Sequence, residues 1–137
     1  MRRVFIDTGA FYALADRSDR HHVEAIETAG QLSRRRIYVF TSDYVVAESH
    51  VLMMVRLGHE IARKWVSTLD VQIEFGTQSD LEAAKRIITS HTDKDYSLTD
   101  ALSMAIMRRM NTEEVFGFDS HFTSAGFNLI SSKTGLS

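Results

Sequence analysis

The chain has 137 residues, of which 44% are hydrophobic, so we expect a single domain, residues 1–137, with its own core. The net charge of −2 argues against a general nucleic-acid binder, and the lack of cysteine excludes disulfides and thiolate metal sites. No apolar run approaches the roughly 20 residues that span a bilayer, and no signal peptide precedes Asp7, so we expect a cytoplasmic protein with no membrane partner.

Short apolar runs of strand length alternate along the chain with segments of helical periodicity. In chain order we predict a strand at 3–7, helices at 10–14 and 20–34, a strand at 37–41, helices at 43–56 and 59–69, a strand at 71–75, helices at 79–90 and 98–110, a strand at 115–118, a short helix at 120–125 and a strand at 128–131. Asp19 and Ser42 are the expected N-caps of the second and third helices. This alternation is typical of an α/β fold with a mostly parallel five-stranded sheet covered on both faces.

Two of the predicted strands end at an aspartate. Asp7 closes the run 3–7, and Asp119 directly follows the run 115–118. Ligands of open parallel sheets bind beyond the carboxyl ends of the strands, so we expect both carboxylates at one edge of the sheet. Each aspartate also precedes a helical segment, so either could be a helix N-cap and nothing more.

A third acid, Glu48, lies on what reads as an apolar face of helix 43–56. The residues that share this face by helical spacing are Val45, Leu52 and Val55. A carboxylate that faces a core is costly unless it is paired or binds a metal. Alternatively, Glu48 extends sideways to solvent or pairs with an arginine.

A fourth acid, Asp100, lies in the first turn of helix 98–110, which is apolar on nearly every side and therefore expected to be buried. Ser97 and Asp100 have the spacing of a capping box, which is an alternative to a role in a site.

Two carboxylates about 4 Å apart repel by roughly 4 kcal/mol at an effective dielectric constant of 20. A cluster of such acids therefore needs a cation, or a proton on at least one member.

These acids lie in motifs that resemble a known family. In chain order the motifs are Ile6-Asp7-Thr8, Val45-Val46-Ala47-Glu48-Ser49, Ser97-Leu98-Thr99-Asp100-Ala101 and Phe118-Asp119-Ser120-His121-Phe122. Their order and approximate spacing resemble PIN-domain nucleases, and more narrowly the VapC-like toxins of bacterial and archaeal type II toxin–antitoxin pairs. The resemblance covers nearly the whole chain.

The resemblance implies a three-layer α/β/α sandwich and an endoribonuclease that depends on Mg²⁺ or Mn²⁺. By matched position, the catalytic and metal-binding acids of the family fall on Asp7, Glu48, Asp100 and Asp119, with supporting hydroxyl groups on Thr8 and Ser97. Four carboxylates with no required histidine suit Mg²⁺ or Mn²⁺ better than zinc. The implied partners are an RNA substrate, a cognate antitoxin protein and a second copy of the chain.

Two further features have weaker chemical meaning. His121 lies two residues after Asp119 and could support the acids or contact a phosphate. The densest basic run is Arg34-Arg35-Arg36, which could contact the RNA backbone, although cations at a helix C-terminus also favour the helix dipole.

Two other functions fit part of the pattern. A phosphatase that uses Asp7 as its nucleophile commonly has a second aspartate two residues later, but position 9 is glycine. A non-catalytic PIN-like domain that only binds RNA or a partner would not need all four acids. A metal-dependent ribonuclease is therefore the function that the sequence favours.

Overall fold

The computed structural model describes residues 1–134, and its centre is a five-stranded sheet in which every pair of neighbouring strands is parallel. The strands are β1 (Arg2–Ile6), β2 (Ile37–Ser42), β3 (Gln72–Glu74), β4 (Glu114–Phe116) and β5 (Asn128–Ile130). Their order across the sheet is β3-β2-β1-β4-β5, so the first strand of the chain lies in the middle. The predicted five-stranded α/β architecture is confirmed.

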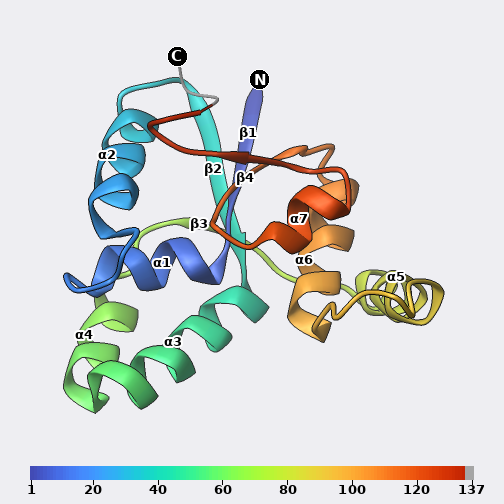
Figure 1. Cartoon of the computed structure of the whole chain (residues 1–137), viewed down its shortest axis with the longest axis horizontal. Helices are drawn as coiled ribbons and strands as arrows, with labels where there is room; N and C mark the ends of the chain where they lie inside the picture. The colour runs from blue at the N-terminus through green and yellow to red at the C-terminus, as the bar shows by residue number, and fades with distance from the viewer. Residues whose placement is uncertain (135–137) are drawn as a thin grey trace.

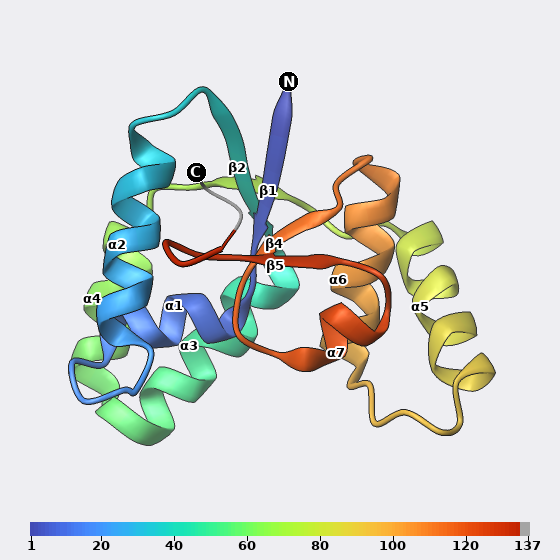
Figure 2. The same cartoon turned by 45° about the horizontal axis from the view of Figure 1, so that its top comes forward.

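Seven helices surround this sheet within the described part of the chain. They are α1 (Thr8–Ala15), α2 (His22–Ser33), α3 (Asp43–Leu57), α4 (His59–Thr68), α5 (Gln78–Ser90), α6 (Leu98–Arg109) and α7 (Ser120–Ser124). Figures 1 and 2 show α1 and α2 on one side of the sheet and α5, α6 and α7 on the other, with α3 and α4 below the carboxyl ends of the central strands. None of these helices is long and apolar enough to cross a lipid bilayer.

The core lies where β1, β2 and β4 meet the helices on both faces. Phe5, Phe40 and Phe116 are almost completely buried, and the rings of Phe5 and Phe40 meet edge to face at 5.4 Å. Because central strands of a parallel sheet are covered on both sides, they carry continuous apolar runs rather than an alternating pattern. Helix α6 is buried from Ala101 to Met107, as its composition predicts.

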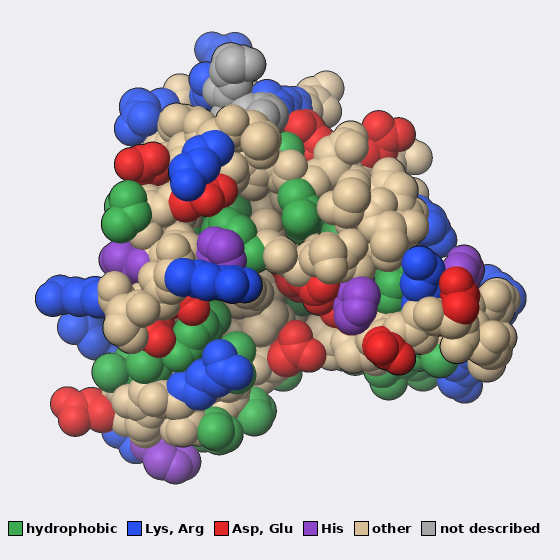
Figure 3. Space-filling view, viewed as in Figure 1, with side chains coloured by type: hydrophobic (Ala, Val, Ile, Leu, Met, Phe, Trp, Pro, Cys, Tyr) green, Lys and Arg blue, Asp and Glu red, His purple; other side chains and the backbone are tan. Residues whose placement is uncertain are grey.

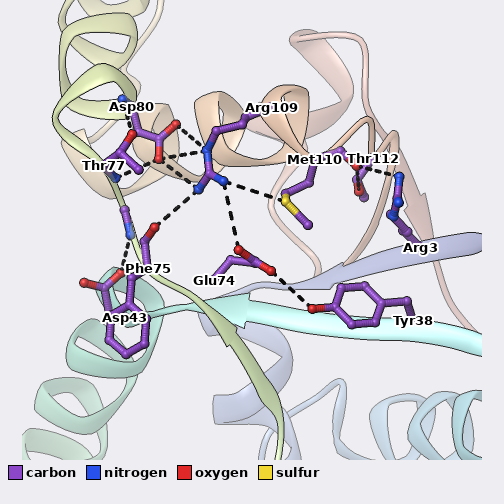
Figure 4. A network of polar contacts seen from close by, with 11 residues as sticks. Arg3, Tyr38, Asp43, Glu74, Phe75, Thr77, Asp80, Arg109, Met110 and Thr112 are labelled. Carbon is purple, nitrogen blue, oxygen red and sulfur yellow. Dashed lines mark hydrogen bonds and ion pairs between the residues drawn. The ribbon is translucent and has the colours of Figure 1, made fainter.

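An arginine at the last turn of α6 joins this helix to α5 and β3 (Figure 4). Arg109 donates from Nε to Asp80 Oδ1 at 3.1 Å and from Nη2 to the carbonyl oxygen of Phe75 at 3.3 Å. Burial alone would raise the pKa of Asp80, but hydrogen bonds from Arg109 and from the cap residue Thr77 outweigh it, and the pKa is lowered. The ion pair therefore fixes how α6, which carries Asp100 at its other end, packs on α5.

The predicted element boundaries hold to within about two residues, with one wrong cap. Ser42 caps α3 as expected, since its hydroxyl accepts from the backbone N–H of Val45. Asp19 does not cap α2, which begins at His22 after the N-cap residue His21. The carboxylate of Asp19 instead accepts from the backbone N–H of His21 at 3.0 Å and closes a turn before the helix.

Candidate metal centre at the carboxyl edge of the sheet

Asp7 is the most buried of the candidate acids, with 5% of its surface exposed. It directly follows β1, and its backbone N–H donates to the carbonyl oxygen of Phe116 in β4 at 3.0 Å. Although Asp7 occupies the N-cap position of α1, its side chain makes no capping hydrogen bond. A methyl group added at Gly117 would lie 3.1 Å from Asp7 Cβ, so glycine at this position makes room for the carboxylate.

The environment of Asp7 disfavours its charged form. Its pKa is raised to about 7, chiefly by burial and to a smaller extent by the charges of Asp100, Glu48 and Asp119. A hydrogen bond from the backbone N–H of Thr8 acts in the opposite direction but is outweighed. The four acids are therefore close enough to interact electrostatically around one buried carboxyl group.

Glu48 reaches this cluster from α3 and is held by a hydroxyl group. Thr8 Oγ1 donates to Glu48 Oε1 at 2.7 Å, which joins the first turn of α1 to the middle of α3. The expectation that Glu48 shares a core-facing stripe with Val55 is wrong, because Val55 is 77% exposed. The buried face of α3 consists of Val45, Ser49 and Met53, so Glu48 lies beside this face and not on it.

Asp100 combines the two roles that the sequence left open. It forms the capping box of α6, in which Ser97 Oγ accepts from the backbone N–H of Asp100 and Asp100 Oδ2 accepts from the backbone N–H of Ser97. The same Oδ2 lies 3.1 Å from His121 Nδ1. Capping thus fixes the orientation of a carboxylate that also faces the other acids.

Asp119, in the loop after β4, and His121, in α7, complete the group. Asp119 Oδ1 accepts from the backbone N–H of His121 at 2.9 Å and lies 3.4 Å from its Nδ1. The candidate ligand atoms of Asp100, Asp119 and His121 all lie within 4.8 Å of one another. This spacing is compatible with one metal ion, and the side chains of Asp119 and His121 are 38% and 33% exposed, so the group is open to solvent.

The donor set fits a metal ion that prefers oxygen ligands. Figure 3 shows acidic side chains in the hollow at the centre of this face, with histidine and basic side chains on its borders. Without a cation the carboxylates repel one another, and the charges of Asp100, Glu48 and Asp119 add to the effect of burial in raising the pKa of Asp7. A divalent cation would relieve this repulsion, and carboxylate oxygens are the protein ligands that Mg²⁺ and Mn²⁺ favour.

Three comparisons identify the family. A family model described as PIN domain matches residues 4–128. The chain belongs to the PIN domain family.

Individual relatives agree with this assignment. A 23S rRNA-specific endonuclease of Mycobacterium tuberculosis, VapC20, is 33% identical over 129 residues, which cover 90% of this chain and 95% of VapC20. Its crystal structure, described as a sarcin–ricin loop cleaving toxin, superposes with a TM-score of 0.84 at 28% identity and covers 93% of this chain and 98% of that one. A VapBC2 complex from Rickettsia felis shares the PIN fold at a TM-score of 0.72 but is only 11% identical, covering 93% and 97% of the two chains.

The basic run Arg34-Arg35-Arg36 lies at the opposite edge of this PIN domain from the acids. It ends α2 and leads into Ile37, which pairs with Arg2 at the amino end of β1, whereas Asp7 follows the carboxyl end of that strand. The structure therefore does not bring the run together with the acidic cluster. RNA contact by these three residues stays a prediction that the geometry of the site does not support.

The structure brings together aromatic and basic side chains around α1 and the loop after it, which the sequence did not indicate as a group. The ring of His21 stacks on Phe118 with centroids 4.1 Å apart and planes at 3°. Arg56 lies over the ring of Tyr12 at 5.2 Å, and Arg20 is exposed in the loop between α1 and α2. Each of these residues is unremarkable in the sequence, and only their proximity to Asp119 or to α1 gives them a place at the site.

Proposed function

We propose that this chain is a metal-dependent endoribonuclease and the toxin of a toxin–antitoxin pair. The observation that carries the proposal is the convergence of acids from the end of β1, from α3, from α6 and from the loop after β4 at one edge of the sheet, around an Asp7 whose pKa is raised to about 7, first by burial and then by the charges of the other acids. The PIN match and the similarity to VapC20 support the same conclusion.

Asp7, Asp100 and Asp119 would hold Mg²⁺ or Mn²⁺, with Glu48 at the side of the cluster. When bound, such an ion supplies a Lewis acid and an activated water for phosphodiester hydrolysis. Thr8 keeps Glu48 in place through its 2.7 Å hydrogen bond, and Ser97 does the same for Asp100 through the capping box. His121 lies against both Asp100 and Asp119 and so fixes the distance between their carboxylates.

The proposed substrate is RNA, and the first candidate is the sarcin–ricin loop of 23S rRNA. This choice rests on VapC20, which is named for that activity and is 33% identical to this chain. Structural neighbours that include a toxin–antitoxin complex from Klebsiella pneumoniae support a cognate antitoxin as the protein partner. Release from that partner would then control when the acids meet RNA.

We also propose that a second copy of the chain packs on α3. Val51 and Val55, one helical turn apart, are 53% and 77% exposed. They line a mostly apolar groove of about 510 Å³ with Leu52 and Tyr44. An exposed apolar surface beside a functional site is typical of an interaction surface.

Cleavage assays test the enzyme directly. The purified protein should cut ribosomes or a synthetic sarcin–ricin loop hairpin with Mg²⁺ or Mn²⁺ and stop when EDTA is added. Mutation of residues that only support metal ligands lowers metal affinity or activity about 10- to 100-fold. Asp119→Asn and Asp100→Asn change proposed ligands themselves, so each should reduce the cleavage rate by roughly 100-fold or more.

A matched control is Glu60→Gln, which removes an exposed acid in the first turn of α4. This variant should cleave like the wild type. Cleavage that survives both EDTA and Asp119→Asn would contradict the proposed function, as would failure to cut any RNA with either metal.

A further inference from the structure

Three aromatic rings form a series from the core to the border of the acidic hollow. Phe116 in β4 is 1% exposed and meets Phe118 edge to face at 6.3 Å. Phe118, which is partly exposed, stacks on His21 with centroids 4.1 Å apart and planes at 3°. His21 is the outermost ring of the series, and Phe118 directly precedes Asp119.

The loop that carries His21 is held in shape by its own polar side chains. Asp16 Oδ1 accepts from the backbone N–H and the hydroxyl of Ser18 at 2.9 and 2.7 Å. Asp19 Oδ2 accepts from the backbone N–H of His21 at 3.0 Å. Arg20 Nε donates to His21 Nε2 at 3.2 Å, so both the backbone and the ring of His21 are fixed.

From this arrangement we propose that the His21–Phe118 pair is a stacking platform for a nucleobase of the RNA next to the cleaved phosphate. The inference rests on the proposed ribonuclease function and assigns to the same site a way of holding the neighbouring nucleotide. His21 is partly exposed. A flat ring that is already oriented can take a base on the face that Phe118 does not cover at little entropic cost, and stacking on protein rings contributes about 1–3 kcal/mol per base. The stack tolerates different bases, because every base has a π face.

The charges around the platform suit a nucleic acid strand. Arg17 and Arg20 are exposed in the same loop, and Arg56 is exposed at the end of α3 beside Tyr12. Figure 3 shows basic side chains on the border of the hollow opposite the α5–α7 side. A strand whose phosphate lies at the acids can therefore have its backbone near these arginines and one base on His21.

The test measures binding of a short unstructured oligoribonucleotide that carries 2-aminopurine, whose fluorescence falls when it stacks. Asp100→Asn serves as the background, so that the oligomer is bound without being cut. In this background His21→Ala should weaken binding roughly 5- to 100-fold and abolish the fluorescence quenching. His21→Phe, which keeps a flat ring, should retain both, and His59→Ala, an exposed histidine of α4, should change neither.

The salt dependence separates stacking from charge. Loss of a stack leaves the slope of log affinity against log salt unchanged, whereas loss of one phosphate contact reduces it by about 0.7 on a single strand. Unchanged binding by His21→Ala, failure of His21→Phe to restore it, or a reduced slope would each overturn the platform. If the wild type cleaves RNA and any of these results is found, only the stacking platform is overturned. If the wild type does not cleave RNA but the variants bind as expected, only the proposed enzyme activity is overturned.

Discussion

At the scale of the residue, Asp7 shows how the fold prepares a carboxylate for a cation. The side chain is buried, lacks the capping bond that its position allows, and packs against Gly117, where any side chain would crowd it. As a result, the pKa of this carboxyl group is raised to about 7, first by burial and then by the charges of Asp100, Glu48 and Asp119.

This shift predicts a pH dependence of the metal-free protein. Because the folded pKa of Asp7 lies above the unfolded value of 3.8, the folded state binds more protons between these values. The contribution of Asp7 to the free energy of unfolding should therefore fall as pH rises from about 4 to about 7, by up to about 4 kcal/mol, since one pKa unit corresponds to about 1.4 kcal/mol. Urea unfolding in EDTA at pH 4 to 8 measures this change.

The comparison with Asp7→Asn isolates the contribution of this residue. The variant should lack this part of the decrease and be more stable than the wild type at pH 8 without metal. Glu60→Gln, which removes an exposed acid elsewhere, should follow the wild-type curve. If the free energy of unfolding of Asp7→Asn fell with rising pH as steeply as that of the wild type, the raised pKa of Asp7 would be contradicted.

The sequence predicted the positions of the acids better than their contacts. Asp7, Asp100 and Asp119 stand at strand ends or helix starts and Glu48 stands within α3, and these places follow from local patterns that can be read in a single segment. The contact between His121 and Asp100 could not be read in this way, because it joins α7 to α6 across the tertiary structure.

At the scale of the element, the packing of α6 on α5 depends on one ion pair. Asp80 is 3% exposed and is held by Arg109 through both carboxylate oxygens, while Glu74, 4.0 Å from Arg109, accepts from the hydroxyl of Tyr38. Arg109 also meets the backbone of Phe75. A single guanidinium group therefore joins α6 to α5 and to β3.

Arg109→Ala should destabilise the protein by about 3–5 kcal/mol, because it leaves the carboxylate of Asp80 buried without its partner. Urea unfolding measures the loss, and Arg86→Ala, an exposed arginine of α5, is the matched control with a change near zero. Adding Asp80→Asn to Arg109→Ala should recover part of the loss. Equal effects of Arg109→Ala and Arg86→Ala would contradict a structural ion pair.

The helices and strands themselves were largely predictable, and the exceptions have physical causes. The apolar run of α6 and the Ser42 cap are local signals, and both were confirmed. Asp19 has the residue type of an N-cap, but its carboxylate closes a turn one step earlier, and His21 takes the cap position. Val55 has the spacing of a core residue, but α3 extends beyond the sheet edge, where nothing within the described chain covers it.

At the scale of the whole molecule, the exposed valines of α3 predict self-association. The wild type should have about twice the 15.6 kDa mass of one chain in light scattering. Val55→Glu should lower the measured mass toward that of the monomer, because a charge in an apolar interface is costly. The fold should tolerate this change, because Val55 is 77% exposed. Val23→Glu, 68% exposed on α2, is the control. A monomeric wild type, or a Val55→Glu variant that remains dimeric, would contradict this surface.

The predicted order of the elements already placed the basic run directly before a strand, and therefore at the amino edge of a parallel sheet. Arg34, Arg35 and Arg36 form the obvious basic run, yet the chain direction places them before β2, at the amino edge. The basic residues near His21 and Tyr12 come singly from separate segments, Arg20 from a loop and Arg56 from the end of α3. Residues that only the tertiary structure assembles leave no local pattern.

The central position of β1 has a consequence for the synthesis of the protein. The strand made first pairs with β4, and Arg2 forms its 2.7 Å ion pair with Glu114, near the other end of the chain. A growing polypeptide therefore lacks Asp119 and the strand beside β1 until residues 114–119 have been made. A chain that stops before residue 119 would carry at most three of the four acids, so the acidic group is complete only after β4 has been made.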